Sequence, residues 1–473
     1  MRKQKKVLVL SSSLLTDRVL LFSTFSEALV PHAEAEVWLS SYPQNVALWK
    51  SKGFVAAGFP AVNRLSTFYN LLKKINNYAW SVRLNAVSIK SLQRLNKELG
   101  AEDHGPLPLR WASKLAIVLG KIIGHLGLQS FFEKILLPRL VHAANSPEAR
   151  TRLQAAKPDL LVTTNPMWGL ETAVALEAQA LGIPIFSFIP SWDNITTKSR
   201  FAFKAVAYSV WSNLRKEELY TYYPYTQNKA VYVIGAPQYD VFFMPQYEES
   251  RTDFCQKNGL DPQLPIVLYA LGSPMFIKSE LATALDVISA MNQAGKLNRY
   301  QVLVRPHPHK QNNELVAELA SFHRNVHIQD VGGAGLPSEK RSQSEVKIID
   351  WISTIKHADV IVNLSSTILL DGAMFDKTSL NINFDHSPEG TYNQFIKQLR
   401  TWPHLKTVSD SGAVLYSNAV SEVLSNIDEV LEAPATRLEQ IKRLRTTIVN
   451  NEDGQSGVKM ANAILNCLHL QAK

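Results

Sequence analysis

The sequence predicts an α/β protein with two doubly wound parallel-sheet domains and a helical tail at its C-terminal end. Three observations lead to this fold class. Short apolar runs that suit buried strands alternate with segments of helical periodicity along most of the 473 residues. The alternation stops in a polar stretch at 245–265 and then begins again. A chain of this length also exceeds what one hydrophobic core usually holds.

The first half is expected to open with a strand at 6–10. Basic residues before an apolar run also occur in secretory leaders, but this run ends at three serines after only four residues, which favours a strand. Strand-type and helix-type segments then alternate. Strands are predicted at 35–39, 158–163, 183–188, 205–211 and 230–235, and helices at 16–30, 66–98, 168–181 and 213–222.

The second half repeats the pattern, and helical periodicity fills most of 415–470. We therefore predict one domain at 1–245, with a basic and apolar helical insert at 66–141, and a second domain at 246–473 that includes the tail. The strands of the second domain are predicted at 266–270, 301–305, 326–330, 359–364 and 379–383, and its helices at 279–293, 311–322, 346–357 and 367–375.

The composition is that of an ordinary globular protein, with 46% hydrophobic and 19% charged residues, and it argues against disorder. The two cysteines, Cys255 and Cys467, are far apart and form no CxxC pair. We therefore expect neither a disulfide framework nor a cysteine-based zinc site. We expect the protein to work in a reducing compartment. No run of about 18 uncharged apolar residues occurs, so we expect no membrane-spanning helix.

The net charge of +9 comes from the first third of the chain. Residues 1–150 hold 20 Lys and Arg against 9 Asp and Glu, whereas the rest holds 30 against 32. Such a surface could face an anionic lipid, a nucleic acid or an acidic acceptor, or it could be a solvated helix face. Nucleic-acid binding is not expected, because aromatic and basic residues do not interleave in a recognition motif.

The segment 111–141 is densely apolar. Its polar residues Lys114, Lys121 and His125 are spaced by seven and four, which places them on one helical face. A narrow basic stripe on an apolar helix is typical of a helix that lies in a membrane interface. A buried helix with one exposed face would give the same pattern, so both interpretations stay open.

Polar residues follow the strand predicted at 301–305, in the sequence VLVRPHPH. Arg305, His307 and His309 come at the end of this strand. In open α/β sheets, ligands bind beyond the carboxyl ends of the strands, and the prolines stiffen the backbone that carries the imidazoles. His307 or His309 could bind a phosphate or protonate a leaving group, or could cap the strand end. A zinc site would need further clustered ligands, so we predict no metal.

Two more strand ends in the second half suit an anionic ligand. Gly272 and Ser273 follow the strand at 266–270, where a small residue lets backbone approach a phosphate. Ser365, Ser366 and Thr367 follow the strand at 359–364 and start a predicted helix, where they could bind a phosphate or act as plain caps. Asp371, about one turn further, could accept from ribose hydroxyls or face solvent.

The first half offers a candidate acceptor site. Trp192, Asp193 and Asn194 form a loop after the strand at 183–188, where Asp193 could act as a general base and Trp192 as a surface for sugar stacking. The same loop could be a turn anchored by Asn194 around a packed tryptophan. Asn165 and Ser12 end two further strands and would lie nearby.

These motifs resemble those of glycosyltransferases with the GT-B fold, in which two Rossmann-like domains face a cleft. The nearest likeness is to the branch that includes CDP-glycerol glycerophosphotransferases and the sialyl- and Kdo-type capsule transferases. The resemblance covers about 230–390. Its Arg-x-His-Pro-His element corresponds to Arg305, His307, Pro308 and His309, and its serine motif to Ser365, Ser366, Thr367 and Asp371, continued by Ala373 and by Phe375, Asp376 and Lys377.

The resemblance implies transfer of a sugar from a CMP-, CDP- or UDP-linked donor to a glycan or lipid-linked acceptor, without an obligatory metal or cofactor. His307 and the strand-end hydroxyls would stabilise the leaving nucleotide, and Asp193 would deprotonate the acceptor. It also implies surface polysaccharide synthesis in the bacterial cytoplasm, with peripheral contact to the inner face of an anionic membrane.

Three other functions remain open. A CDP-glycerol-type glycerophosphotransferase would use the same motifs. A UDP-sugar 2-epimerase would need several carboxylates and histidines together, whereas the first half offers one good carboxylate, Asp193. A non-enzymatic nucleotide- or lipid-binding protein would keep the ligand but lose the reaction.

Overall fold

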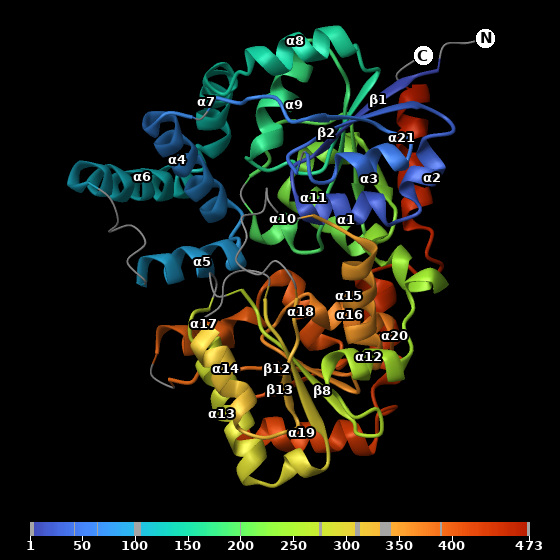
Figure 1. The fold of residues 1–473 in the computed structure, drawn as a ribbon. Coiled ribbons are helices and arrows are strands. Elements are labelled where there is room, and N and C mark those ends of the chain that lie inside the picture. Colours follow the sequence, from blue (N-terminus) through green and yellow to red (C-terminus); the bar gives the residue numbers. More distant parts are fainter. Residues whose placement is uncertain are drawn as a thin grey trace. The chain divides into compact units, whose positions relative to one another are not determined.

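The computed structural model describes residues 4–470 apart from 42, 64, 99–105, 199, 274–276, 308–312, 332–341 and 388–389. The chain forms two compact units (Figure 1). Unit 1 comprises 1–240 and 453–473, and unit 2 comprises 241–452. Each unit is built on a parallel sheet with helices on its faces, which confirms the predicted fold class.

The described residues of unit 1 form a seven-stranded parallel sheet in the order β3-β2-β1-β4-β5-β6-β7. The central strand β1 pairs with β2 and β4, with Val7 opposite both Ala35 and Leu160. Its apolar run is fully buried, as a strand covered on both faces requires. The strands are β1 (Lys6–Ser11), β2 (Glu34–Leu39), β3 (Val55–Gly58), β4 (Leu160–Thr163), β5 (Ile185–Phe188), β6 (Ala207–Val210) and β7 (Ala230–Val233).

The helices of unit 1 fall into two groups (Figure 1). Helices that connect strands cover the sheet, while α4 to α7 form the insert between β3 and β4. Among the described residues, no helix combines the length and apolarity needed to cross a membrane. The helices are α1 (Leu14–Leu21), α2 (Phe25–Leu29), α3 (Val46–Ser51), α4 (Thr67–Arg83), α5 (Val87–Glu98), α6 (Leu107–His125), α7 (Gln129–Ala143), α8 (Pro147–Ala156), α9 (Leu170–Ala180), α10 (Asn194–Thr197), α11 (Asn213–Tyr222) and α21 (Ser456–Leu470).

The described residues of unit 2 form a six-stranded parallel sheet in the order β10-β9-β8-β11-β12-β13. The central strands β8 and β11 are fully buried, and their core continues into α13 and α19. The strands are β8 (Ile266–Ala270), β9 (Gln301–Arg305), β10 (Val326–Ile328), β11 (Val360–Asn363), β12 (Ser379–Ile382) and β13 (Val414–Ser417). The helices are α12 (Arg251–Asn258), α13 (Glu280–Gln293), α14 (Asn313–Ser321), α15 (Glu345–His357), α16 (Ile368–Met374), α17 (Thr391–Leu399), α18 (Pro403–Asp410), α19 (Val420–Glu432) and α20 (Leu438–Ile448).

The C-terminal helix α21 belongs to unit 1, which differs from the predicted division at 245. It packs against α2, and its first turn is held by the buried carboxylate of Asp240. The backbone N–H groups of Ser456 and Gly457 donate to this carboxylate at 3.0 and 2.8 Å. The backbone N–H and the hydroxyl of Thr24 donate to the same group at 3.1 and 2.7 Å. The tail is therefore fixed to the first unit by a four-donor cluster.

Candidate functional site

In each unit taken by itself, most of the predicted site residues follow strands that lie at, or next to, the point where the strand order reverses. In unit 2, β9 and β10 lie on one side of β8, and β11 to β13 lie on the other. In unit 1, β1 and β4 occupy the same position. The carboxyl ends of such strand pairs leave a crevice that suits a ligand, because the connections leave in opposite directions. Gly272, Ser273 and Ser365 to Thr367 follow β8 and β11 directly.

The loop after β8 is held by a buried glutamate. The backbone N–H of Gly272 donates to both carboxylate oxygens of Glu280, at 3.0 and 2.9 Å. A Cβ atom at position 272 would lie 2.9 Å from Oε2 of Glu280, so a larger residue would have to displace this carboxylate. Burial raises the pKa of Glu280 to about 7, although the Gly272 hydrogen bond acts in the opposite direction. Ser273, the next residue, is half-buried.

The loop after β11 turns sharply and leaves hydroxyl groups accessible. Ser365 has a φ of +50°, in the left-handed region that few residues other than glycine adopt. The side chain of Asn363 supports this turn by accepting the backbone N–H of Ser366 at 2.9 Å. Ser366 is half-buried and Thr367, the N-cap of α16, is exposed and makes no side-chain cap bond. The predicted helix start is thus present, and Asn363 is the anchor that the sequence did not reveal.

The residues at the end of β9 take different positions. The guanidinium of Arg305 donates to Oε1 of Gln329 at 2.5 Å and to the hydroxyl of Thr354 at 3.3 Å, so neighbouring elements of unit 2 orient it. His307 follows β9 by two residues and is half-buried. His309 lies outside the described residues.

Asp371 does not occupy either of its predicted environments. Its carboxylate is buried and accepts the indole N–H of Trp351 at 3.0 Å. It therefore neither faces solvent nor presents an open carboxylate to a ribose. The reason is that position 371 lies on the side of α16 that packs against α15.

In unit 1, Ser12 and Asn165 meet at a carboxylate that sequence reasoning missed. The Ser12 hydroxyl donates to Oε1 of Glu171 at 2.6 Å, and the backbone N–H of Asn165 donates to Oε2 at 3.1 Å. Thr164 adds its backbone N–H and its hydroxyl, both at 2.7 Å. Burial raises the pKa of Glu171 to about 7 against these four bonds. Glu171 thus ties the carboxyl ends of β1 and β4 together.

The predicted stacking role of Trp192 is wrong. Its side chain is 2% exposed and lies in the interior of unit 1, where it offers no open face to a sugar. Its carbonyl accepts a hydrogen bond at 2.7 Å from Arg215, which is itself buried. The anchored-turn interpretation of this loop, with a packed tryptophan, agrees with these contacts.

Asp193 is half-buried and already has three donors. Its Oδ1 accepts from the hydroxyl of Ser191 at 2.5 Å and from the amide of Asn194 at 3.2 Å, and its Oδ2 accepts from the hydroxyl of Thr197 at 2.9 Å. Hydrogen bonds to a carboxylate favour the charged form and weaken the group as a base. Asn194 is buried beside it, so its amide orients Asp193 and faces no open surface.

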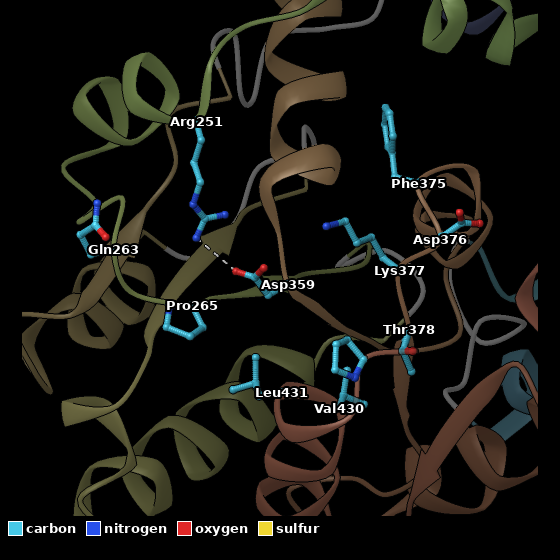
Figure 2. Close-up of a pocket in the computed structure, with 11 residues that line it drawn as sticks. Arg251, Gln263, Pro265, Asp359, Phe375, Asp376, Lys377, Thr378, Val430 and Leu431 are labelled. Carbon is cyan, nitrogen blue, oxygen red and sulfur yellow. Dashed lines mark hydrogen bonds and ion pairs between the residues drawn. The ribbon is translucent and has the colours of Figure 1, made fainter. Parts of the chain in front are cut away.

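A pocket of about 380 Å³ lies at the amino ends of the unit 2 strands, opposite to the carboxyl ends that carry the predicted donor-site residues (Figure 2). Pro265, Asp359 and Thr378 line it and precede β8, β11 and β12. Figure 2 shows Arg251 and Lys377 extending toward Asp359, which accepts from Arg251 at 3.2 Å. Among the residues that the structure describes, no predicted donor-site residue lines this pocket. Phe375, Asp376 and Lys377, the continuation of the serine motif, line it instead.

Burial lowers the pKa of the Lys377 ammonium in this pocket. Arg251 also donates to the backbone carbonyls of Pro262, Leu264 and His357, at 3.1, 2.9 and 2.7 Å. Its guanidinium therefore fixes the segment that enters β8 to the start of β11. We interpret Arg251 as a structural link and not as part of the candidate site.

The comparisons with known proteins identify the fold. Models of protein families give no match, and no curated protein matches the sequence. Among solved structures, the S. aureus MnaA–UDP co-structure is similar with a TM-score of 0.56 and 12% identity, over 99% of this chain and 98% of that one. A UDP-N-acetylglucosamine 2-epimerase is similar with a TM-score of 0.54 and 12% identity, over 100% of this chain and 97% of that one. UDP-GlcNAc 2-epimerase from Neisseria meningitidis, bound to UDP-GlcNAc, is similar with a TM-score of 0.52 and 11% identity, over 98% of this chain and 100% of that one. At these identities the similarity shows the shared GT-B type of fold alone.

Proposed function

We propose that this chain is a glycosyltransferase that moves a sugar from a nucleotide-activated donor to a glycan or lipid-linked acceptor in bacterial surface polysaccharide synthesis. The observation that carries the proposal is the pair of strand ends at the switch point of unit 2. There the Gly272–Ser273 loop after β8 lies one strand from the accessible hydroxyls of Ser366 and Thr367 after β11. Solved structures of the same fold, among them the MnaA–UDP co-structure and the 2-epimerase bound to UDP-GlcNAc, support a nucleotide-linked ligand.

The donor phosphates would bind at these strand ends. Hydroxyl and backbone N–H groups donate to phosphate oxygens without a charge of their own, and they stabilise the negative charge that develops on the departing nucleotide. His307, after the neighbouring strand β9, would supply a proton or a charged hydrogen bond to the same phosphate. Arg305, His309 and Ser365 remain proposed contributors to this site, whereas Asp371 is left out because it is buried against Trp351.

The acceptor would be activated in unit 1. Asp193 remains the proposed base because it is half-buried at the end of β5, whereas Glu171 is completely buried. Its three donors would have to rearrange for it to take a proton. Ser12 and Asn165 would form the neighbouring wall, at the ends of β1 and β4.

We expect transfer to be acceptor-dependent. UDP-, CMP- and CDP-linked donors would be incubated with the protein, with and without a bacterial membrane lipid extract, and nucleotide release and donor stereochemistry followed by NMR. A glycosyltransferase releases nucleotide only when the extract is present. Release of CMP with transfer of glycerol phosphate from CDP-glycerol would identify the glycerophosphotransferase alternative. Conversion of UDP-GlcNAc to its 2-epimer without an acceptor would contradict the proposal and favour an epimerase. Because we expect no obligatory metal, EDTA should leave the rate unchanged.

Asp193→Asn should reduce kcat about 10²- to 10⁴-fold if Asp193 is the base, because loss of general base catalysis typically costs this much. Asn194→Asp would not serve as the control variant, because it adds a charge next to Asp193. The matched control is Asp453→Asn, an exposed carboxylate paired with Lys459, which should keep the full rate. An unchanged kcat in Asp193→Asn would remove Asp193 from the mechanism.

A further inference from the structure

Large apolar side chains are concentrated on the surface of α6 and the start of α7. Of the eighteen large hydrophobic residues that are exposed in the described part of the chain, eleven lie between Leu107 and Ile135. Their exposed fractions run from 38% to 68%, the highest belonging to Trp111. We call this set the apolar face. It consists of Leu107, Leu109, Trp111, Leu115, Val118, Leu119, Ile122, Leu126, Leu128, Phe131 and Ile135.

The packing of α6 explains why this face points outward. The residues that α6 buries are the small ones, Ala116, Gly120 and Gly124, which recur every fourth position and form one line on the helix. Helix α6 lies beside α4 (Figure 1), and this line of small residues faces it. A Cβ atom at Gly120 would come within 2.6 Å of Cβ of Tyr78, and one at Gly124 within 2.7 Å of the carbonyl oxygen of Ala79.

Globular proteins ordinarily place the bulky apolar side of a helix inward. Helix α6 does the reverse, since its close contact with α4 uses the small residues and leaves the bulky ones outside. The sequence left open whether this segment is a buried helix, and the exposed fractions exclude that alternative. Contiguous apolar patches of this kind mark contact with a protein or a membrane.

The charges around the apolar face are of one sign. Between Leu107 and Ala143 the exposed charged residues are Lys114, Lys121, Lys134 and Arg139. The one acidic residue of this segment, Glu133, is largely buried and forms an ion pair with Arg200, whose Nη2 lies 2.6 Å from Oε2. Between Leu107 and Ala143 the surface therefore combines bulky apolar groups with cations and shows no exposed carboxylate.

We propose that the apolar face is a docking surface for an anionic lipid bilayer, with α6 lying in the plane of the interface. The apolar side chains would enter the acyl boundary while Lys121 and Lys134 contact lipid phosphates. Trp111 suits the same depth, because its ring is apolar and its indole N–H is polar. This inference goes beyond the proposed function and does not depend on it.

A second copy of the chain is a poorer partner for this surface. A two-fold interface brings the same patch of both subunits together, so the positively charged set Lys114, Lys121 and Lys134 of one subunit would meet the same set of the other. Like charges that meet in this way oppose association. A bilayer rich in phosphate groups meets the same cations with the opposite sign.

The test uses the full-length protein and sedimentation with vesicles of phosphatidylcholine, with and without phosphatidylglycerol. We expect binding to the anionic vesicles. The Trp111→Ser/Leu115→Ser variant should bind on the order of 100-fold more weakly, because it removes two large apolar groups from the acyl boundary. In Lys121→Gln/Lys134→Gln the affinity for vesicles should fall about fivefold for each charge removed, and mainly for the anionic vesicles.

The matched control is Val346→Ser/Leu470→Ser, which removes two apolar side chains of similar exposure, 62% and 60%, outside the apolar face. It should bind as the wild type does. Failure of the wild type to bind anionic vesicles would overturn the proposal, as would an equal loss in the control. A wild-type dimer in the ultracentrifuge that Trp111→Ser/Leu115→Ser converts to monomer, with no vesicle binding, would show instead that the face joins two copies. None of these readouts involves a nucleotide, so their failure is separate from failure of the proposed function.

Discussion

Asp240→Ala should lower the free energy of unfolding by about 3 to 5 kcal/mol. The carboxylate is fully buried, and removing it leaves four donors from Thr24, Ser456 and Gly457 without an acceptor. Losing one partner of a buried charged cluster costs this much because the remaining polar groups stay desolvated. Gly457 offers no room to compensate, since a Cβ there would lie 2.4 Å from the backbone nitrogen of Phe25.

Urea denaturation measures this loss, and amide hydrogen exchange locates it. The amides of α21 and α2 should exchange faster than those of the unit 1 sheet. Asp453→Ala is the matched control, because this carboxylate also lies at the start of α21 but is half exposed and paired with Lys459. It should cost less than about 1 kcal/mol. Equal losses in the two variants would contradict the assigned role of Asp240.

Glu280→Gln should change how stability depends on pH. Burial raises the pKa of Glu280 from 4.5 to about 7 in the folded protein. A raised folded pKa means that the contribution of the protonated group is fully present below pH 4.5 and is lost as pH rises through 7. Between pH 5 and pH 8 the free energy of unfolding of wild type should therefore fall by about 2 to 3 kcal/mol more than that of Glu280→Gln.

The measurement compares urea denaturation of both proteins at pH 5 and pH 8, and the difference between them isolates the one group. Glu439→Gln provides the control, because the Glu439 side chain is 77% exposed and should give curves parallel to wild type. If Glu280→Gln also runs parallel to wild type, Glu280 ionises in the folded protein as an ordinary carboxylate does. The interpretation of the Gly272 loop as resting on a largely protonated glutamate would then be wrong.

Most strands were predictable because each is a short, buried apolar run between polar turns. Two were not. β3 is four residues long and only partly buried, so its Val55–Gly58 run lacks the apolar signal of a covered strand. β13 lies inside a region of helical periodicity, and its pairing with β12 comes from a partner about 35 residues away. The local sequence pattern does not predict such long-range strand pairing.

Helix boundaries depended on backbone features that composition does not show. The helix expected at 66–98 is divided into α4 and α5 at Asn85, whose φ is +49°. The helix expected at 16–30 is interrupted between α1 and α2 at Ser23 and Thr24. Thr24 instead bonds Asp240, which is 216 residues away, and this long-range contact also decides where the tail belongs.

The candidate site was predictable in position and less so in detail. Strand-end glycine, serine and histidine residues stand out because they follow apolar runs. The buried glutamates that support them do not, since Glu171 and Glu280 look like ordinary acidic residues in the first turn of a helix. Trp192 and Asp371 have the right chemistry for a ligand, but burial directs both toward the protein interior.

The most direct test of the donor site is nucleotide binding to the full-length protein, followed as a thermal shift with CMP, CDP, UDP, GDP and ADP. A ligand at about 100 times its Kd adds roughly 2.7 kcal/mol of stability, which raises Tm clearly. We predict a raised Tm with a cytidine or uridine nucleotide in wild type and in the control His469→Ala, whose side chain is exposed on α21. The shift should be lost in His307→Ala and in Ser366→Ala. No shift of wild type with any of the five nucleotides would contradict the donor site and would leave only the lipid-binding form of the non-enzymatic alternative.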